Sequence, residues 1–92
     1  MTMTVRDNKE RRRFEMDVDG GLAFANYRAD DSVVVVTHTE VPAALQGRGV
    51  GSRFVREMLD LIRANGRKVV PRCGFVAAFI RGHPEYQDLL AR

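Results

Sequence analysis

A change of hydrophobic periodicity at a glycine-rich segment constrains the fold of this chain more than any other feature. Before residue 41, apolar and polar side chains alternate, which is the period of a β-strand. After residue 49, apolar side chains recur at the spacing of an amphipathic helix. The segment Gln46-Gly47-Arg48-Gly49-Val50-Gly51, with three glycines in five residues, lies between them. The pattern predicts an α+β fold with these glycines at a strand-to-helix junction.

The first half of the chain predicts antiparallel strands. Residues 12–18 alternate between an apolar and a charged face, and Asp19-Gly20-Gly21 is typical of a hairpin turn, where glycine accepts the positive φ. Further strands are expected over residues 22–28 and 33–41. Four consecutive valines in the last strand predict burial on both of its faces. The first strand's apolar face is Phe14, Met16 and Val18, and its charged face is Arg13, Glu15 and Asp17.

The second half predicts helices around one short strand. A helix is expected over residues 49–65, followed by a strand over residues 68–71. After a helical crossover, this strand pairs most easily parallel to residues 33–41. A second helix over residues 75–81 and a last turn beginning at His83-Pro84-Glu85 complete the chain. The expected architecture is a mostly antiparallel sheet with a β-α-β unit and short C-terminal helices, in one domain over residues 1–92.

Composition excludes several classes of protein. Of the 92 residues, 45% are hydrophobic and 29% are charged, as in globular domains. No apolar run approaches the ~20 residues that span a membrane. The N-terminal residues lack the apolar core of a signal peptide. Because Cys73 is the single cysteine, no intramolecular disulfide is expected, and a cytoplasmic location is the default.

The positive charge raises the question of nucleic-acid binding. Thirteen of the fifteen basic residues are arginine, which suits phosphate contact but equally reflects the codon bias of a GC-rich genome. The cluster Arg11-Arg12-Arg13 leads directly into a predicted strand, so it indicates a solvated strand start. The sequence contains no zinc-ligand spacing and no recognition-helix pattern. We therefore expect no metal and no specific nucleic acid, with a small nucleic-acid-binding protein as an alternative.

The glycine segment is either a flexible linker or a backbone site for phosphate. A linker is poorly placed inside a compact domain, directly before a helix. A helix N-terminus leaves backbone N–H groups unpaired and favours negative charge, and glycines allow a ligand to approach the backbone closely. The spacing differs from that of the P-loop and of the dinucleotide-binding fingerprint. A phosphate-binding loop of another type is expected.

The segment Gln46-Gly47-Arg48-Gly49-Val50-Gly51 resembles the Q/R-x-x-G-x-G/A signature of the GNAT acetyltransferases. The stretches "HTEVP", "GRGVGSRFV" and "KVVPRCGFVAAFIRGHPEY" extend this resemblance over residues 14–90, to the short single-domain YjdJ-type subfamily. One departure is Gly74, where the subfamily often has proline after the cysteine. The subfamily lacks the flanking helices and last strands of full-length GNAT domains, so its acceptor pocket is incomplete.

The resemblance implies acetyl-CoA as co-substrate and transfer of its acetyl group to an amine. In GNAT folds, the strands that correspond to residues 33–41 and 68–71 splay apart, and the pantetheine arm lies between them. The backbone near Glu40 and Val41 would then face the cofactor. The remaining cofactor-binding residues implied by the family are Gln46, Gly47, Arg48, Gly49, Val50, Gly51, Ser52 and Arg53.

Three side chains are candidates for catalysis. Glu40 lies where some GNAT enzymes place a general base, and His38 shares its face of the strand, although both also fit an exposed strand end. Cys73 precedes a predicted helix start, so its thiol is a candidate acid for the CoA thiolate, a nucleophile, or a small buried hydrophobe. A CoA-binding module without catalysis is the alternative function. The sequence leaves open the acceptor, whether polyamine, protein lysine or N-terminus, and the oligomeric state, a monomer included.

Overall fold

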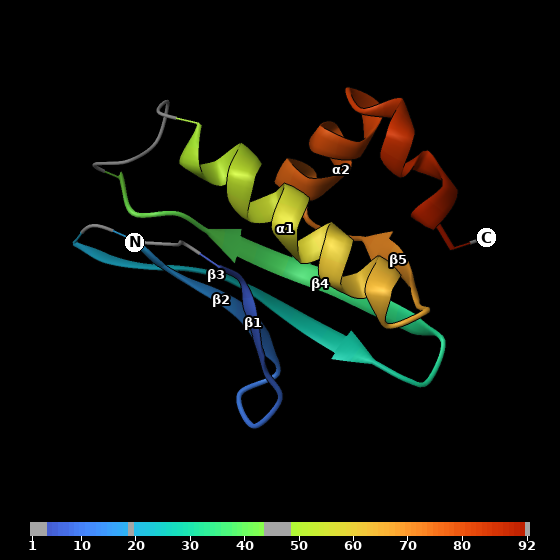
Figure 1. Cartoon of the computed structure of the whole chain (residues 1–92), viewed down its shortest axis with the longest axis horizontal. Coiled ribbons are helices and arrows are strands. Elements are labelled where there is room, and N and C mark those ends of the chain that lie inside the picture. The colour runs from blue at the N-terminus through green and yellow to red at the C-terminus, as the bar shows by residue number, and fades with distance from the viewer. Residues whose placement is uncertain (1–3, 19, 44–48, 92) are drawn as a thin grey trace.

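The computed structural model describes residues 4–18, 20–43 and 49–91 of the chain (Figure 1). All the predicted strands and helices in these ranges are present, with ends within one residue of those expected, except that the last helical segment is longer. The elements are β1 (Arg6–Asn8), β2 (Arg13–Val18), β3 (Gly21–Ala29), β4 (Val33–Glu40), α1 (Val50–Ala64), β5 (Lys68–Pro71), α2 (Gly74–Arg81) and the 3₁₀ helix η2 (Pro84–Leu89).

The strands form one sheet in the order β1-β2-β3-β4-β5. Neighbouring strands are antiparallel except for β4 and β5, which are parallel and joined through α1. This arrangement confirms the predicted α+β fold with its β-α-β unit. The sequence did not predict β1, because three polar residues, Arg-Asp-Asn, carry no alternating apolar pattern.

Helices α1 and α2 both contact the β4–β5 side of the sheet (Figure 1). The predicted apolar stripe of α1 is confirmed, because its five central side chains are almost completely buried. In β4, Val34 and Val36 are buried, whereas Val33 and Val35 are only half-buried. The prediction that both faces of this strand are buried is therefore wrong for the second face. The buried residues of α1 are Phe54, Val55, Met58, Leu59 and Ile62.

A β-bulge in β4 decides which side chains face the helices. Tyr27 of β3 pairs with Val36 and Asn26 pairs with His38, so Thr37 has no partner position on β3. The extra residue shifts the side-chain alternation by one. Thr39 pairs with the buried Ala25 and shares its helix-covered face, while His38 and Glu40 lie on the opposite face.

Glu15 corrects the expected charged face of β2, because its side chain is only 3% exposed. Its carboxylate lies 3.0 Å from Arg6 and accepts hydrogen bonds from Arg13 and from Asn8, the latter at 3.1 Å. Burial alone would raise the pKa of Glu15, but the hydrogen bonds from Arg13 and Asn8 outweigh it and hold the pKa below its usual value. The long arginine side chains thus cover a carboxylate that the alternation pattern places in solvent.

We expect Glu15→Gln to lower the free energy of unfolding by about 1–2 kcal/mol at neutral pH, since hydrogen bonds between charged partners are lost. The folded-state pKa is depressed, so this stabilisation is present above the unfolded pKa of about 4.3 and disappears as the pH falls through the folded value. The difference between wild type and variant in urea unfolding should therefore shrink in acid. Asp17→Asn is the control, because Asp17 also pairs with Arg6 but is 78% exposed. Equal losses in both variants would contradict a special role for Glu15.

Candidate functional site

The parallel pairing of β4 and β5 stops before β4 ends. The last paired positions are Val36 and Pro71, and the Arg72 N–H donates to the Val36 carbonyl at 2.9 Å. The chain then leaves the sheet and begins α2 at Gly74. Beyond Val36, β4 pairs only with β3 among the strands that the structure describes. The two strands diverge here, where the resemblance places the pantetheine arm.

Cys73 lies at this divergence, as the residue that precedes α2. Burial raises the pKa of its thiol, but the Thr39 hydroxyl and the backbone N–H groups of Val76, Phe75 and Thr39 outweigh this effect and lower the pKa below its ordinary value. The thiol therefore lies between the free edge of β4 and the N-terminus of α2. Its surroundings stabilise a thiolate.

Thr39 is a site residue that the sequence did not reveal. Its Oγ1 atom is buried and has no hydrogen-bond partner of regular geometry in the described part of the chain. A buried hydroxyl without such a partner is unusual, because it loses its bonds to water. The Thr37 bulge turns this side chain toward Cys73, and nothing in the residue order of β4 marks the bulge.

His38 and Glu40 lie together, as predicted, on one face of β4. His38 Nε2 is 2.9 Å from Glu40 Oε2, and both side chains are more than half exposed. The His38 ring also lies edge-on to Phe24, with ring centroids 6.4 Å apart. Because the bulge places this pair on the face opposite Thr39, the structure does not bring it together with the Cys73 thiol.

The glycine segment is described only from Gly49 onward, so the predicted contacts of Gln46, Gly47 and Arg48 lie outside the described residues. Gly49 precedes α1 with φ of 79°, a left-handed conformation that favours glycine. The first turn of α1 contains no acidic residue. Its backbone N–H groups therefore retain the positive end of the helix dipole for an anion.

Gly51 is needed for a reason that the sequence did not suggest. A Cβ atom there would lie 2.8 Å from Cζ of Phe75 and 3.6 Å from a methyl group of Val41. Gly51 thus allows the first turns of α1 and α2 to approach each other. The side chains of Val41 and Val50 pack partly against the core. The cofactor contacts expected of these two residues remain a prediction.

The two remaining predicted cofactor residues are on the first turn of α1. Ser52 is exposed, and Arg53 donates to Glu57 at 2.8 Å, one helical turn further on. The described residues contain no group of three or more His, Cys, Asp or Glu side chains placed to hold a metal ion. Nor does any described helix have the length and apolarity that crossing a membrane requires.

A family model for GCN5-related N-acetyl-transferases matches residues 13–89. The chain is 26% identical over 89 residues to Protein NATD1 of Mus musculus, covering 92% of this chain and 80% of the relative. It is 27% identical over 90 residues to Protein NATD1 of Danio rerio, covering 95% and 82% of the two chains. The solution NMR structure of a GCN5-like protein from Staphylococcus aureus superimposes with a TM-score of 0.72 at 25% identity, covering 97% of this chain and 88% of that one.

The fold, in which β4 diverges from β5, belongs to the class of α+β domains represented by that GCN5-like structure. The chain belongs to the GCN5-related N-acetyltransferase family, which confirms the resemblance carried by its glycine segment.

Proposed function

We propose that this chain is a single-domain cytoplasmic enzyme that transfers an acetyl group from acetyl-CoA to an amine. The observation that carries the proposal is the position of Cys73. Its thiol lies where β4 separates from β5, beside the α2 N-terminus, and the adjoining residue Phe75 approaches Gly51 on the first turn of α1. The start of α1, which we propose binds phosphate, and the Cys73 thiol thus lie on either side of the contact between Gly51 and Phe75.

The residues present suit acetyl-CoA. The N–H groups that start α1, with no acidic side chain in the first turn, would bind its pyrophosphate. The free edge of β4 offers the Thr39 N–H, which is directed at the same space as the Cys73 thiol. A fixed N–H donor of this kind stabilises the negative charge that develops on a thioester oxygen during attack.

In the proposed reaction, a neutral amine attacks the thioester carbon, the carbon–sulfur bond breaks, and the CoA sulfur leaves with the electron pair. Cys73 protonates this departing thiolate, and the proton lost by the amine later restores the thiol through solvent. Cys73 is therefore the proposed acid. The exposed His38–Glu40 pair is the candidate base for an amine that arrives from the open face of β4.

Two measurements test this function. Titration with acetyl-CoA should show saturable binding that weakens as ionic strength rises, because phosphate binding is partly electrostatic. Free thiol should then appear when acetyl-CoA is mixed with a polyamine, a lysine peptide or a peptide with a free N-terminus. Binding without thiol release from any amine would support a CoA-binding module instead, and the absence of binding would exclude both functions.

A further inference from the structure

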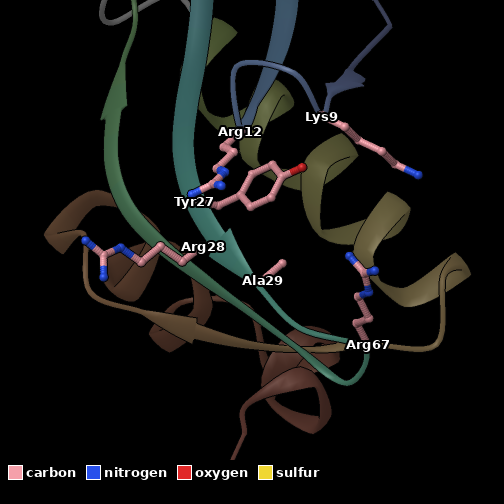
Figure 2. A pocket seen from close by; sticks show the side chains of 6 residues that line it. All are labelled: Lys9, Arg12, Tyr27, Arg28, Ala29 and Arg67. Carbon is pink, nitrogen blue, oxygen red and sulfur yellow. The ribbon is translucent and has the colours of Figure 1, made fainter.

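At the other end of the sheet from Cys73, basic side chains surround a cavity of about 620 Å³ (Figure 2). Its walls come from the β1–β2 turn, the end of β3 and the residue before β5. Among the residues that the structure describes, no acidic side chain lines it. Figure 2 shows Arg12 and Arg67 on either side of the Tyr27 ring. The Lys9 side chain extends outward on the side of Arg67, and Arg28 extends outward on the opposite side, so Lys9, Arg12 and Arg67 are taken as the cations of the site. The lining residues are Lys9, Arg12, Tyr27, Arg28, Ala29 and Arg67.

The three cations are not neutralised by ion pairs. Within the described ranges, the salt bridges involve other basic side chains and none of Lys9, Arg12 or Arg67. Asp7 is close by, but its carboxylate accepts a hydrogen bond from the Tyr27 hydroxyl. Asp30 accepts hydrogen bonds from Ser32 and Val33 within its own turn, and the positive charge of Arg67 helps to lower the pKa of its carboxyl group. Four basic side chains line the cavity, so they outnumber these two nearby carboxylates and the local charge is positive.

The backbone of Arg12 is held in an unfavourable conformation. Its φ is 53°, the left-handed region that side chains other than glycine and asparagine seldom adopt. The Tyr27 N–H donates to the Arg12 carbonyl at 2.9 Å, and the Arg12 N–H donates to the Lys9 carbonyl at 3.2 Å. Glycine would suit this turn better. Backbone strain of this kind is found more often at functional sites than elsewhere.

Tyr27 provides a rigid, uncharged wall. Its side chain is buried, and its ring packs on Phe14 with centroids 4.7 Å apart. Burial, followed by the hydrogen bond to Asp7, raises the pKa of Tyr27 to about 12. The hydroxyl thus stays protonated at physiological pH. Tyr27 therefore adds no negative charge to the cavity.

We propose that this cavity is a second ligand site, which binds a compact phosphorylated anion with two or more negative charges. Guanidinium groups pair with phosphate oxygens in bidentate fashion, and an ammonium group adds a mobile point charge. Cations from two separate segments can contact different oxygens of one phosphate group or of two linked ones. Because the site lies at the opposite end of β4 from Cys73, it does not depend on the proposed acetyl transfer.

Titration of inorganic pyrophosphate, followed by amide and arginine side-chain chemical shifts, tests the proposal. Shifts should centre on residues 9–12, 27–29 and 67. Arg12→Gly should weaken binding about fivefold, the upper end of the effect of losing one partly exposed charge contact. Its melting temperature should stay the same or rise, because glycine relieves the positive φ. A loss of affinity caused by unfolding would instead lower it.

The matched control is Arg11→Gly, which removes the same charge from the same turn at an exposed residue that does not line the cavity. Its affinity for pyrophosphate should stay within about twofold of wild type, since only the long-range electrostatic potential at the cavity changes. Arg67→Gln, on a different segment, should weaken binding as Arg12→Gly does. Three results would overturn the proposal. They are equal losses of affinity in the Arg11 and Arg12 variants, chemical-shift changes confined to the start of α1, and no chemical-shift changes at millimolar pyrophosphate.

Discussion

Cys73→Ala should lower the rate of acetyl transfer at least about a hundredfold while leaving the affinity for CoA nearly unchanged. General acid catalysis contributes effects of this size, and an interaction made mainly in the transition state affects turnover rather than binding. Cys73→Ser should be almost as slow, because a hydroxyl is too weak an acid to protonate a thiolate. If Cys73 only fills space, Cys73→Ser should instead keep full activity and Cys73→Ala should cost a little stability.

The pH profile separates the two chemical roles of the thiol. An acid must be protonated, so in direct transfer the rate falls as the pH rises through the pKa of Cys73, which lies below its ordinary value. A nucleophile must be ionised, so the rate would rise over the same range. Thr39→Val removes the hydroxyl that contributes most to lowering this pKa. The falling limb should therefore move to higher pH in that variant.

A covalent intermediate would contradict direct transfer. Incubation with acetyl-CoA alone should leave Cys73 unmodified by mass spectrometry. An acetyl group on Cys73 that passes to an added amine at the rate of turnover would establish the nucleophilic route instead. The rate at which Cys73 is acetylated should be compared with the rate of acetyl transfer to the amine in a single-turnover experiment. Slow adventitious acetylation of Cys73 would not lie on the pathway.

The regular elements were predictable because each has a strong local pattern. The apolar stripe of α1 repeats over four turns, and the hairpin turn ending at Gly21 lies between two alternating segments. These patterns depend only on neighbouring residues. They predicted the ends of β4 and β5 to within one residue, whereas the separation of these two strands was expected from the family resemblance.

The parts that were not predictable depend on contacts between distant residues. The burial of Glu15 requires Arg6 on β1, a strand with no pattern of its own. The orientation of Thr39 depends on a one-residue bulge, which the sequence of β4 does not mark. The role of Gly51 depends on Phe75, which lies on another helix. Motif spacing indicated the kind of ligand, whereas the arrangement of side chains around Cys73 required the fold.

Replacing both Gly49 and Gly51 with valine should weaken CoA binding about a hundredfold or more. Loss of two charge-assisted contacts to backbone N–H groups is worth about 3 kcal/mol, which corresponds to this factor. The two glycines act differently. A side chain at Gly49 is strained by the φ of 79° but meets open space, whereas a side chain at Gly51 displaces Phe75. Isothermal titration with CoA, together with thermal unfolding of each single variant, measures both effects.

Gly66 provides a matched control for Gly49, because it lies just after the other end of α1 with φ of 72° and also has open space around it. Gly49→Ala and Gly66→Ala should each cost about 1 kcal/mol of stability, since alanine is strained at positive φ. Only Gly49→Ala should weaken CoA binding, because only that end of the helix carries the unpaired N–H groups. Equal affinities in the two variants would show that the helix start does not bind the pyrophosphate.

For Gly51, the double variant Gly51→Ala/Phe75→Ala removes the overlap between the two helices. If the double variant binds CoA more tightly than Gly51→Ala does, Gly51 is needed for packing. If its binding stays weak, Gly51 is needed for the close approach of phosphate.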